Sequence, residues 1–251
     1  MVLDTVGSVS LLNTAFTQCY VINDTFTNSI NSSISMSSSV DGDSDDSGAV
    51  SMAGGAALSI TAASNVTLTN VTVSMCQTIS FSTVVHGAVW LHDVTGTVLV
   101  EQCTFDRNAA MGVLAVRAAA LSLFSDTFAC TVRFDRNMFT NNIASGGALT
   151  ANVSVPLDIY NSFVTVAGAG VCIDLNGGSF SDSSSFFAHN TAAWGPYVDN
   201  GQSNGGAMSV SHLHKCNISN TVFVYNTAMS VCPVGFGPLG GALYLNNTHS
   251  N

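Results

Sequence analysis

Apolar residues in this chain alternate with polar ones or gather in short blocks, as at Val98-Leu99-Val100, residues 171–175 and Leu243-Tyr244-Leu245. Alternation with a period of two predicts β-strands that bury one face. Gly, Ser, Thr and Asn interrupt the longer apolar runs, so a helical stripe with a 3.6-residue period is rarely sustained. Helix competes with strand only over residues 109–123. The pattern therefore predicts an all-β chain of many short strands.

A motif of phenylalanine, two residues, asparagine, one residue and alanine occurs four times. Its phenylalanines and asparagines are Phe105 and Asn108, Phe139 and Asn142, Phe187 and Asn190, and Phe223 and Asn226. A Gly-Gly-Ala motif follows the last three copies, and its second glycines are Gly147, Gly206 and Gly241. With weaker copies included, glycine turns recur about every 31 residues from Gly55 to Gly241. Such a period is typical of solenoids, whose units bury their apolar faces against their neighbours.

Strands about two dozen residues apart without intervening helices predict a right-handed, single-stranded parallel β-helix. We expect about eight to ten coils in one domain that spans residues 1–251. Each motif phenylalanine is expected to point inward and to stack on the phenylalanine of the next coil. Each motif asparagine is expected to adopt left-handed backbone at a corner and to hydrogen-bond to its neighbours, while the paired glycines form tight turns.

These motifs resemble the FxxN and GGA(I/L/V) repeats of the polymorphic outer membrane proteins of chlamydiae and of related surface proteins of protists. The resemblance covers about residues 50–247. It implies a right-handed β-helix that serves adhesion, with a cell-surface protein or a glycan as its partner. The turns at His86-Gly87-Ala88 and Met111-Gly112-Val113 depart from the family's glycine pattern.

Charged residues make up only 8% of the chain, with 5 Lys and Arg against 15 Asp and Glu, and the net charge is −10. Such a surface disfavours nucleic acid and anionic lipid, both of which require basic clusters. No uninterrupted apolar run of about 18 residues is present, so no transmembrane segment is expected. No signal peptide is visible, and we expect the sequence to be a fragment of a longer secreted or surface protein. Seven N-glycosylation sequons begin at Asn23, Asn31, Asn65, Asn70, Asn152, Asn217 and Asn246.

The chain contains seven cysteines, and their spacing does not match a zinc pattern. Cys76, Cys103 and Cys130 lie 27 residues apart, close to one coil of the expected helix. In such a stack Cys103 lies within disulfide range of Cys76 or Cys130. A ladder of buried free thiols that fill small apolar spaces fits the spacing equally well.

Residues 32–50 are rich in Ser and Asp and are expected to form an insertion or loop between coils. Asp41, Asp43 and Asp45 alternate with small residues, a pattern that can wrap Ca²⁺. The stretch lacks the Gly and Glu of an EF-hand, which favours a solvated loop, and no other cofactor is expected. His212-Leu213-His214 places two imidazoles on one face of an expected strand, with no third metal ligand in view.

Aromatic residues mark two long insertions between the asparagine and glycine motifs. Trp194 and Tyr197 lie in residues 192–205, and Phe236 lies in residues 228–240. Protruding loops of solenoids often carry recognition, so these three side chains are the candidate ligand-binding residues. Loops that fold back over their own coils are the alternative.

A glycan-cleaving enzyme of the pectate lyase or polygalacturonase type is the alternative function, because such enzymes share the β-helix fold. The sequence only mimics their motifs: Asp45-Asp46 lies in the Ser-rich stretch and His86-Gly87 occupies a glycine turn. The pairs Asp106-Arg107 and Asp135-Arg136 are expected to form an ion ladder on the surface rather than a catalytic pair of carboxyls. The sequence therefore favours a non-enzymatic, extracellular or cell-surface adhesin or scaffold without catalytic residues.

Overall fold

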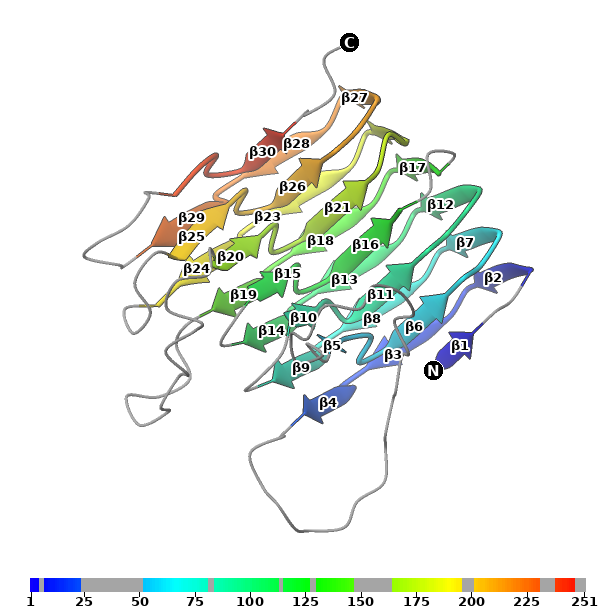
Figure 1. Ribbon diagram of the computed structural model, residues 1–251, viewed down its shortest axis with the longest axis horizontal. Helices are drawn as coiled ribbons and strands as arrows, with labels where there is room; N and C mark the ends of the chain where they lie inside the picture. Colours follow the sequence, from blue (N-terminus) through cyan, green and yellow to red (C-terminus); the bar gives the residue numbers. More distant parts are fainter. Residues whose placement is uncertain are drawn as a thin grey trace, which may run out of the picture.

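The computed structural model describes residues 1–4, 7–23, 52–80, 84–112, 115–126, 130–146, 164–195, 201–230 and 238–246. All regular structure in these residues is β-strand, and neighbouring strands pair in parallel. The strands stack in register from β1 at one end to β30 at the other (Figure 1). The expected all-β parallel solenoid is confirmed. No helix that could cross a membrane is found in the part of the chain that the structure describes.

Five parallel sheets, named A to E here, each take one strand from successive coils. Sheet A contains β1 (Val2–Asp4), β6 (Leu58–Thr61), β11 (Val89–His92), β16 (Leu121–Ser125), β21 (Val171–Leu175), β26 (Met208–Ser211) and β30 (Leu243–Asn246). Sheet B contains β2 (Ser8–Leu12), β7 (Asn65–Thr69), β12 (Thr97–Glu101), β17 (Thr131–Asp135), β22 (Ser179–Ser183) and β27 (Lys215–Ser219). Sheet C contains β3 (Ala15–Thr17), β8 (Thr72–Ser74), β13 (Thr104–Asp106), β18 (Met138–Thr140), β23 (Phe186–Ala188) and β28 (Val222–Val224). Sheet D contains β4 (Tyr20–Asn23), β9 (Gln77–Ser80), β14 (Ala109–Gly112), β19 (Ile143–Gly146), β24 (Thr191–Trp194) and β29 (Thr227–Ser230). Sheet E contains β5 (Met52–Ala53), β10 (Val84–His86), β15 (Ala115–Arg117), β20 (Val164–Ala167) and β25 (Gly201–Asn204).

Sheets B, C and D hold six strands each, so the described chain forms six coils rather than the expected eight to ten. The three sheets are built from a block of constant length that recurs without insertion. Its copies are residues 8–23, 65–80, 97–112, 131–146, 179–194 and 215–230. The connection from sheet D to sheet E varies instead, from Gly112 to Ala115 in one coil to Gly146 to Val164 in the next. Equivalent residues of neighbouring coils are therefore 57, 32, 34, 48 and 36 residues apart.

The motif phenylalanines form the expected stack in the interior. Ring centroids are 4.6 Å apart for Phe105 and Phe139, 4.7 Å for Phe139 and Phe187, and 5.0 Å for Phe187 and Phe223. The first three rings are fully buried, whereas Phe223 in the last complete coil is partly exposed. Register places each ring beside its equivalent, so the coils bury like on like.

The motif asparagines form a hydrogen-bonded ladder at the corner between sheets C and D. The amide Nδ2 of Asn142 donates to the carbonyl of Phe105 at 3.0 Å and to Oδ1 of Asn190 at 2.8 Å. Its Oδ1 accepts from the backbone N–H of Asn108 at 3.1 Å and from the Asn108 amide at 3.0 Å. The ladder thus satisfies backbone groups that no strand partner reaches at the corner.

The asparagine was expected to have left-handed backbone at this corner. The residue before the asparagine has it instead. Arg107, Asn141, His189 and Tyr225 have φ between 51° and 55°. One residue in that conformation redirects the chain between two strands, and the asparagine that follows can then point into the corner. The backbone part of the expectation was therefore wrong, and the hydrogen-bonding part is confirmed.

Glycine turns precede the sheet A strands β26 and β30. Gly205 and Gly240 have φ of 61° and 60°, and an added Cβ on Gly205 would lie 2.1 Å from the carbonyl oxygen of Met208. A Cβ on Gly206 would lie 2.2 Å from the carbonyl oxygen of Gly241. Gly147 lies outside the described residues, and its neighbour Gly146 ends a sheet D strand instead of preceding a sheet A strand. The regular 31-residue glycine period was wrong because it mixed these two kinds of position.

The cysteine ladder expected from the 27-residue spacing is wrong. Cys103 lies at the corner between sheets B and C, where its N–H donates to Oδ1 of Asn137 at 2.9 Å. Cys76 lies at the next corner, where its N–H donates to Oδ1 of Asn108 at 3.1 Å. Because the coils here advance by 32 and 34 residues, a step of 27 moves each cysteine to a different corner.

Candidate functional site

The outward face of sheet D is uncharged and rich in apolar side chains. Register aligns two rows of outward residues along it. The rows are Tyr20, Gln77, Ala109, Ile143, Thr191 and Thr227, and Ile22, Ile79, Met111, Ser145, Ala193 and Met229. We call these twelve residues the D face. Tyr20 and Ile22 on β4, Ile143 on β19 and Met229 on β29 are exposed, and Ile79 and Met111 in the same rows are half-buried. Exposed apolar surface is typical of interaction sites.

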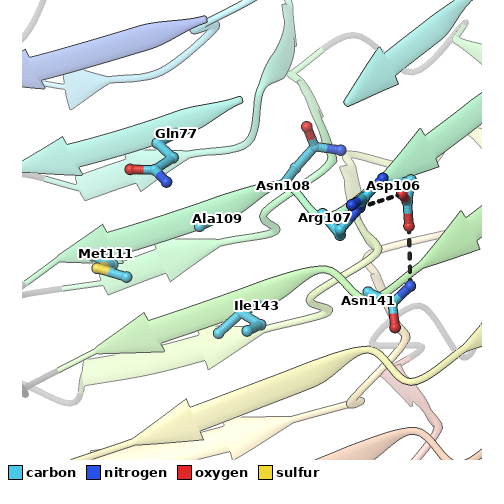
Figure 2. Close-up of a pocket in the computed structure, with 8 residues that line it drawn as sticks. All are labelled: Gln77, Asp106, Arg107, Asn108, Ala109, Met111, Asn141 and Ile143. Carbon is cyan, nitrogen blue, oxygen red and sulfur yellow. Dashed lines mark hydrogen bonds and ion pairs between the residues drawn. The ribbon is translucent and has the colours of Figure 1, made fainter. Parts of the chain in front are cut away.

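An open groove of about 780 Å³ runs along one edge of the D face (Figure 2). It is lined by Gln77, Asp106, Arg107, Asn108, Ala109, Met111, Asn141 and Ile143. Figure 2 shows that Gln77, Met111 and Ile143 come from the strands of the D face. Arg107 and Asn141 come from the corners before β14 and β19, and Asp106 is the last residue of β13. Apolar side chains, amides and a guanidinium thus meet in one depression.

The charges in the groove cancel each other. Asp106 accepts hydrogen bonds from Arg107 Nε at 2.7 Å, Thr140 Oγ1 at 2.7 Å and Asn141 Nδ2 at 3.0 Å. Partial burial acts to raise the pKa of Asp106, but these hydrogen bonds and the Arg107 charge outweigh it and lower the pKa below its ordinary value. Asp106 is therefore an ionised carboxylate that holds the guanidinium group of Arg107 through its Nε. The Arg107 side chain remains 63% exposed.

The expected ion ladder of Asp-Arg pairs is not formed. Asp106 and Arg107 lie at the corner between sheets C and D, whereas Asp135 and Arg136 lie at the corner between sheets B and C. The two pairs have nearly the same geometry, with Nε–Oδ2 distances of 2.7 and 2.8 Å. They stand on different columns of the solenoid, and only the first lines the groove.

Trp194, expected in a protruding binding loop, is the last residue of β24 and is fully buried. It belongs to a small core of valines and alanines between sheets D and E. Gly146 in the preceding coil makes room for the indole, since a Cβ there would lie 2.5 Å from Trp194 Cζ3. The interpretation of Trp194 as a ligand-binding side chain was wrong. Tyr197 and Phe236 lie outside the described residues, so their role stays a prediction.

His212-Leu213-His214, expected on a strand, forms the corner between β26 and β27. His212 has left-handed backbone, and its Nδ1 lies 2.5 Å from Oδ1 of Asp174. Across the described residues no three His, Cys, Asp or Glu side chains gather closely enough to hold a metal. The candidate Ca²⁺ ligands Asp41, Asp43 and Asp45 lie outside those residues.

His86, which belongs to the His86-Gly87 pair of the enzyme alternative, is buried outside both apolar cores, beside Trp90 of sheet A. Its Nδ1 lies 2.8 Å from Ser122 Oγ, and its ring stacks on Trp90 with centroids 4.8 Å apart. Burial, followed by the Arg117 and His92 charges, holds the pKa of His86 well below its ordinary value. His86 is therefore neutral near pH 7 and faces protein rather than a substrate groove.

The D face was not predicted from the sequence, although a signal was present. The residues on either side of the motif alanine point outward, and they are Ala109 and Met111, Ile143 and Ser145, Thr191 and Ala193, and Thr227 and Met229. None of them is charged in any of the four copies. Ile143 and Met229 among them are exposed, and exposed apolar side chains on a strand face indicate an interaction surface. No protein-family model, curated protein or solved structure matches this chain, so its function has to be inferred from the D face and its groove.

Proposed function

We propose that this chain is a non-enzymatic, extracellular or cell-surface adhesin or scaffold that binds an uncharged glycan along the D face. The observation that carries the proposal is the groove beside Arg107, where exposed apolar side chains adjoin amide and guanidinium groups. A sugar ring presents an apolar face and a rim of hydroxyls. Met111 and Ile143 suit the former, and Gln77, Asn141 and Arg107 suit the latter.

The charge of the groove favours an uncharged ligand. Asp106 and Arg107 neutralise each other, while the whole chain carries a net charge of −10. An acidic polymer would be repelled by the remaining surface without gaining a basic cluster in return. A glycan chain can also extend beyond the groove, because the D face continues along all six coils of sheet D.

The groove supports binding better than hydrolysis or elimination. A glycosidase of the usual kind needs two carboxyl groups at a fixed separation, one of them protonated. Among the described residues that line the groove, Asp106 is the single carboxyl group, and its lowered pKa keeps it ionised near neutral pH. Its oxygens already accept hydrogen bonds from Thr140 and Asn141, so Asp106 is poorly placed to donate a proton to a ligand.

The extracellular setting is supported by composition. Lys and Arg number only 5 of 251 residues, and three of the sequon asparagines, Asn65, Asn70 and Asn217, are exposed in the structure. Asn70 lies at the corner between sheets B and C, so that β8 of sheet C stands between it and the D face.

The proposal can be tested with Arg107→Ala and the matched control Arg136→Ala, which removes the same kind of exposed pair at another corner. The purified chain is screened on arrays of neutral and acidic oligosaccharides, and the affinity of the neutral ligand is then measured by calorimetry. Loss of a charged hydrogen-bond donor is expected to weaken binding about ten-fold in the Arg107 variant and less than two-fold in the Arg136 variant.

Equal loss in both variants, or binding by the acidic oligosaccharides alone, would contradict the neutral-glycan proposal. If the chain captured a protein receptor and the Ile143→Asn variant did not, the D face would instead be assigned to protein recognition. Release of shortened or unsaturated sugars by the wild-type chain would establish the enzyme alternative.

A further inference from the structure

Cys19 and Cys76, which the 27-residue spacing does not connect, lie side by side in neighbouring coils. Thr17 pairs with Ser74, and Tyr20 pairs with Gln77, so the residues between them are in register as well. Cys19 therefore lies directly beside Cys76, and the N–H of Gln77 donates to the carbonyl of Cys19 at 2.7 Å. Neighbouring parallel strands are about 4.8 Å apart, which falls within the Cα separation of disulfides.

The two thiols also point the same way. Cys19 Sγ donates to the carbonyl of Thr17 at 3.7 Å, and Cys76 Sγ donates to the carbonyl of Ser74 at 3.5 Å. Cys76 Sγ additionally approaches the carbonyl of Phe16 in the preceding coil at 3.9 Å. Both sulfur atoms therefore face the same corner of the interior, where Cys19 is partly exposed and Cys76 is buried.

The pair occupies the first two positions of the asparagine ladder. The ladder runs from Asn108 to Asn226, and the N–H of Cys76 donates to Asn108 Oδ1 at 3.1 Å. In coils 1 and 2 a thiol replaces the amide, so this corner lacks the strong side-chain hydrogen bonds that join the later coils. A covalent link there would supply the connection that the amides supply elsewhere.

We propose that Cys19 and Cys76 form a disulfide bond that ties coil 1 to coil 2. No other described cysteine has a cysteine beside it in the next coil: Cys103 stands between Val71 and Asn137, and Cys172 between Ser122 and Ser209. The neighbours of Cys130 and Cys216 are Gly178 and Phe180. The disulfide is thus specific to one end of the solenoid.

The oxidant is a small disulfide such as oxidised glutathione. The thiolate of Cys19 attacks one sulfur of the oxidant and releases one glutathione thiolate, which leaves a mixed disulfide on Cys19. Cys76, once deprotonated, attacks the Cys19 sulfur and releases the second glutathione, so two protein thiols are oxidised and one glutathione disulfide is reduced. Burial, together with contact with the Cys19 thiol, raises the pKa of Cys76 to about 12, so the second step is slow in the folded chain.

The link closes a long loop, because equivalent residues of coils 1 and 2 are 57 residues apart in the sequence. Loops of this length gain considerable stability from a disulfide, through a smaller conformational entropy of the open state. The gain is expected at coil 1, because a solenoid unit is held only by its neighbour.

The test refolds the full chain in mixtures of reduced and oxidised glutathione, blocks free thiols and maps linked peptides by mass spectrometry. Amide hydrogen exchange is then compared in the oxidised and reduced chains. We expect a Cys19–Cys76 peptide and roughly ten-fold slower exchange in residues 8–22 after oxidation. Residues 215–230, in the coil at the opposite end, serve as the internal control and should exchange equally in both states.

Cys19→Ser is expected to abolish both the linked peptide and the slower exchange, whereas Cys103→Ser, which alters a buried thiol at another corner, should preserve them. The proposal is overturned if Cys19 and Cys76 remain free in the most oxidising mixture. It is equally overturned if Cys19 pairs with another cysteine, or if the Cys103 variant loses the Cys19–Cys76 peptide while it remains folded.

Discussion

The side of the solenoid made by sheets B, C and D repeats strictly, whereas the side made by sheet E does not. The block from sheet B to sheet D has the same length in six coils, and its corners carry single left-handed residues at equivalent positions. The connections from sheet D to sheet E change length from coil to coil. The long insertions lie between sheets D and E, although the connections from sheet A to sheet B also differ by one or two residues. A stacked ladder of rings and amides requires constant spacing, while a loop that only closes a coil does not.

The interior is divided differently, because sheet D packs with sheet E on a core of its own. The core beneath sheets A, B and C contains Leu, Ile and the stacked phenylalanines, whereas the smaller core between sheets D and E contains only Val, Ala and Trp194 among its fully buried residues. The core beneath sheets A, B and C is therefore expected to supply most of the stability, whereas the D face lies over the smaller core. Substitutions can test this division by comparing the free energy of unfolding that is lost at different positions.

The largest effect is expected for Phe187→Ala, which opens a cavity in the middle of the phenylalanine stack. Phe187 is fully buried and contacts Phe139 and Phe223. The substitution should lower the free energy of unfolding by about 3 to 5 kcal/mol. Phe124→Ala is the matched control, because Phe124 points outward from sheet A and is only partly buried, and it should cost about 1 kcal/mol or less. Equal losses in denaturant unfolding would mean that the stack adds no special stability.

A somewhat smaller loss, about 2 to 4 kcal/mol, is expected for Asn142→Ala. The change removes the amide that bridges Phe105 and Asn190 and leaves the buried N–H of Asn108 without its acceptor. Asn141→Gly in the same corner is the control, because glycine readily adopts the φ of 55° found there. If the free energy of unfolding fell equally in both variants, the corner rather than the ladder would be the source of stability.

Glycine substitutions should give a third, smaller contrast between two copies of one motif. A Cβ on Gly206 would lie 2.2 Å from the Gly241 carbonyl oxygen, so Gly206→Ala should cost about 1 to 3 kcal/mol. For Gly241 the nearest atom to an added Cβ is the Asn226 carbonyl oxygen at 4.0 Å, so Gly241→Ala should change stability by less than about 0.5 kcal/mol. Thermal unfolding of both variants measures the difference, and a costly Gly241→Ala would show that the last turn is as crowded as the one before it.

The fold could be predicted from the sequence because its strongest determinants are local. Alternating apolar residues gave the strands, and the fixed spacing from Phe105 to Asn108 and its three repeats gave the stack and the ladder. The coil number could not be predicted, because Gly146 and Gly205 look alike in sequence but lie at different points of the coil: Gly146 ends a strand and Gly205 lies in a turn. Only the register shows that one closes sheet D and the other precedes sheet A.

The candidate site was predicted poorly for a related reason. Trp194 looked like a loop residue because it follows the motif, but the constant block extends through it and buries it against Gly146. The D face is made of residues from six separate coils, and no short stretch of sequence brings Gln77, Arg107 and Ile143 together. Such a surface becomes visible only when the coils are stacked with the correct period.

Among the described residues of sheets B, C and D one charged side chain points inward, that of Asp182, and its substitution gives the finest test of the comparison. Asp182 points inward from β22, in the column that Phe134 and Ile218 occupy in the neighbouring coils. It is 1% exposed, and its oxygens accept from Ser185 Oγ at 2.5 Å and Thr221 Oγ1 at 2.7 Å. Burial, which outweighs these hydrogen bonds, raises the pKa of Asp182 above its ordinary value.

The raised pKa fixes the sign of the pH dependence. Below the pKa of the unfolded chain both states bind the proton and Asp182 carries no penalty. As the pH rises from that value through the higher pKa of the folded state, the wild type loses stability, because Asp182 ionises less readily in the folded state than in the unfolded state.

Asp182→Asn keeps a polar side chain of the same shape but cannot ionise. It should therefore stabilise the chain by about 1 kcal/mol or less at pH 7 and have almost no effect near pH 3. Denaturant unfolding of the two proteins across this range measures the difference, which should grow with pH and then level off. The opposite result would be a variant that loses stability relative to the wild type as the pH rises from 3 to 7. It would show that Ser185 and Thr221 need the ionised carboxylate.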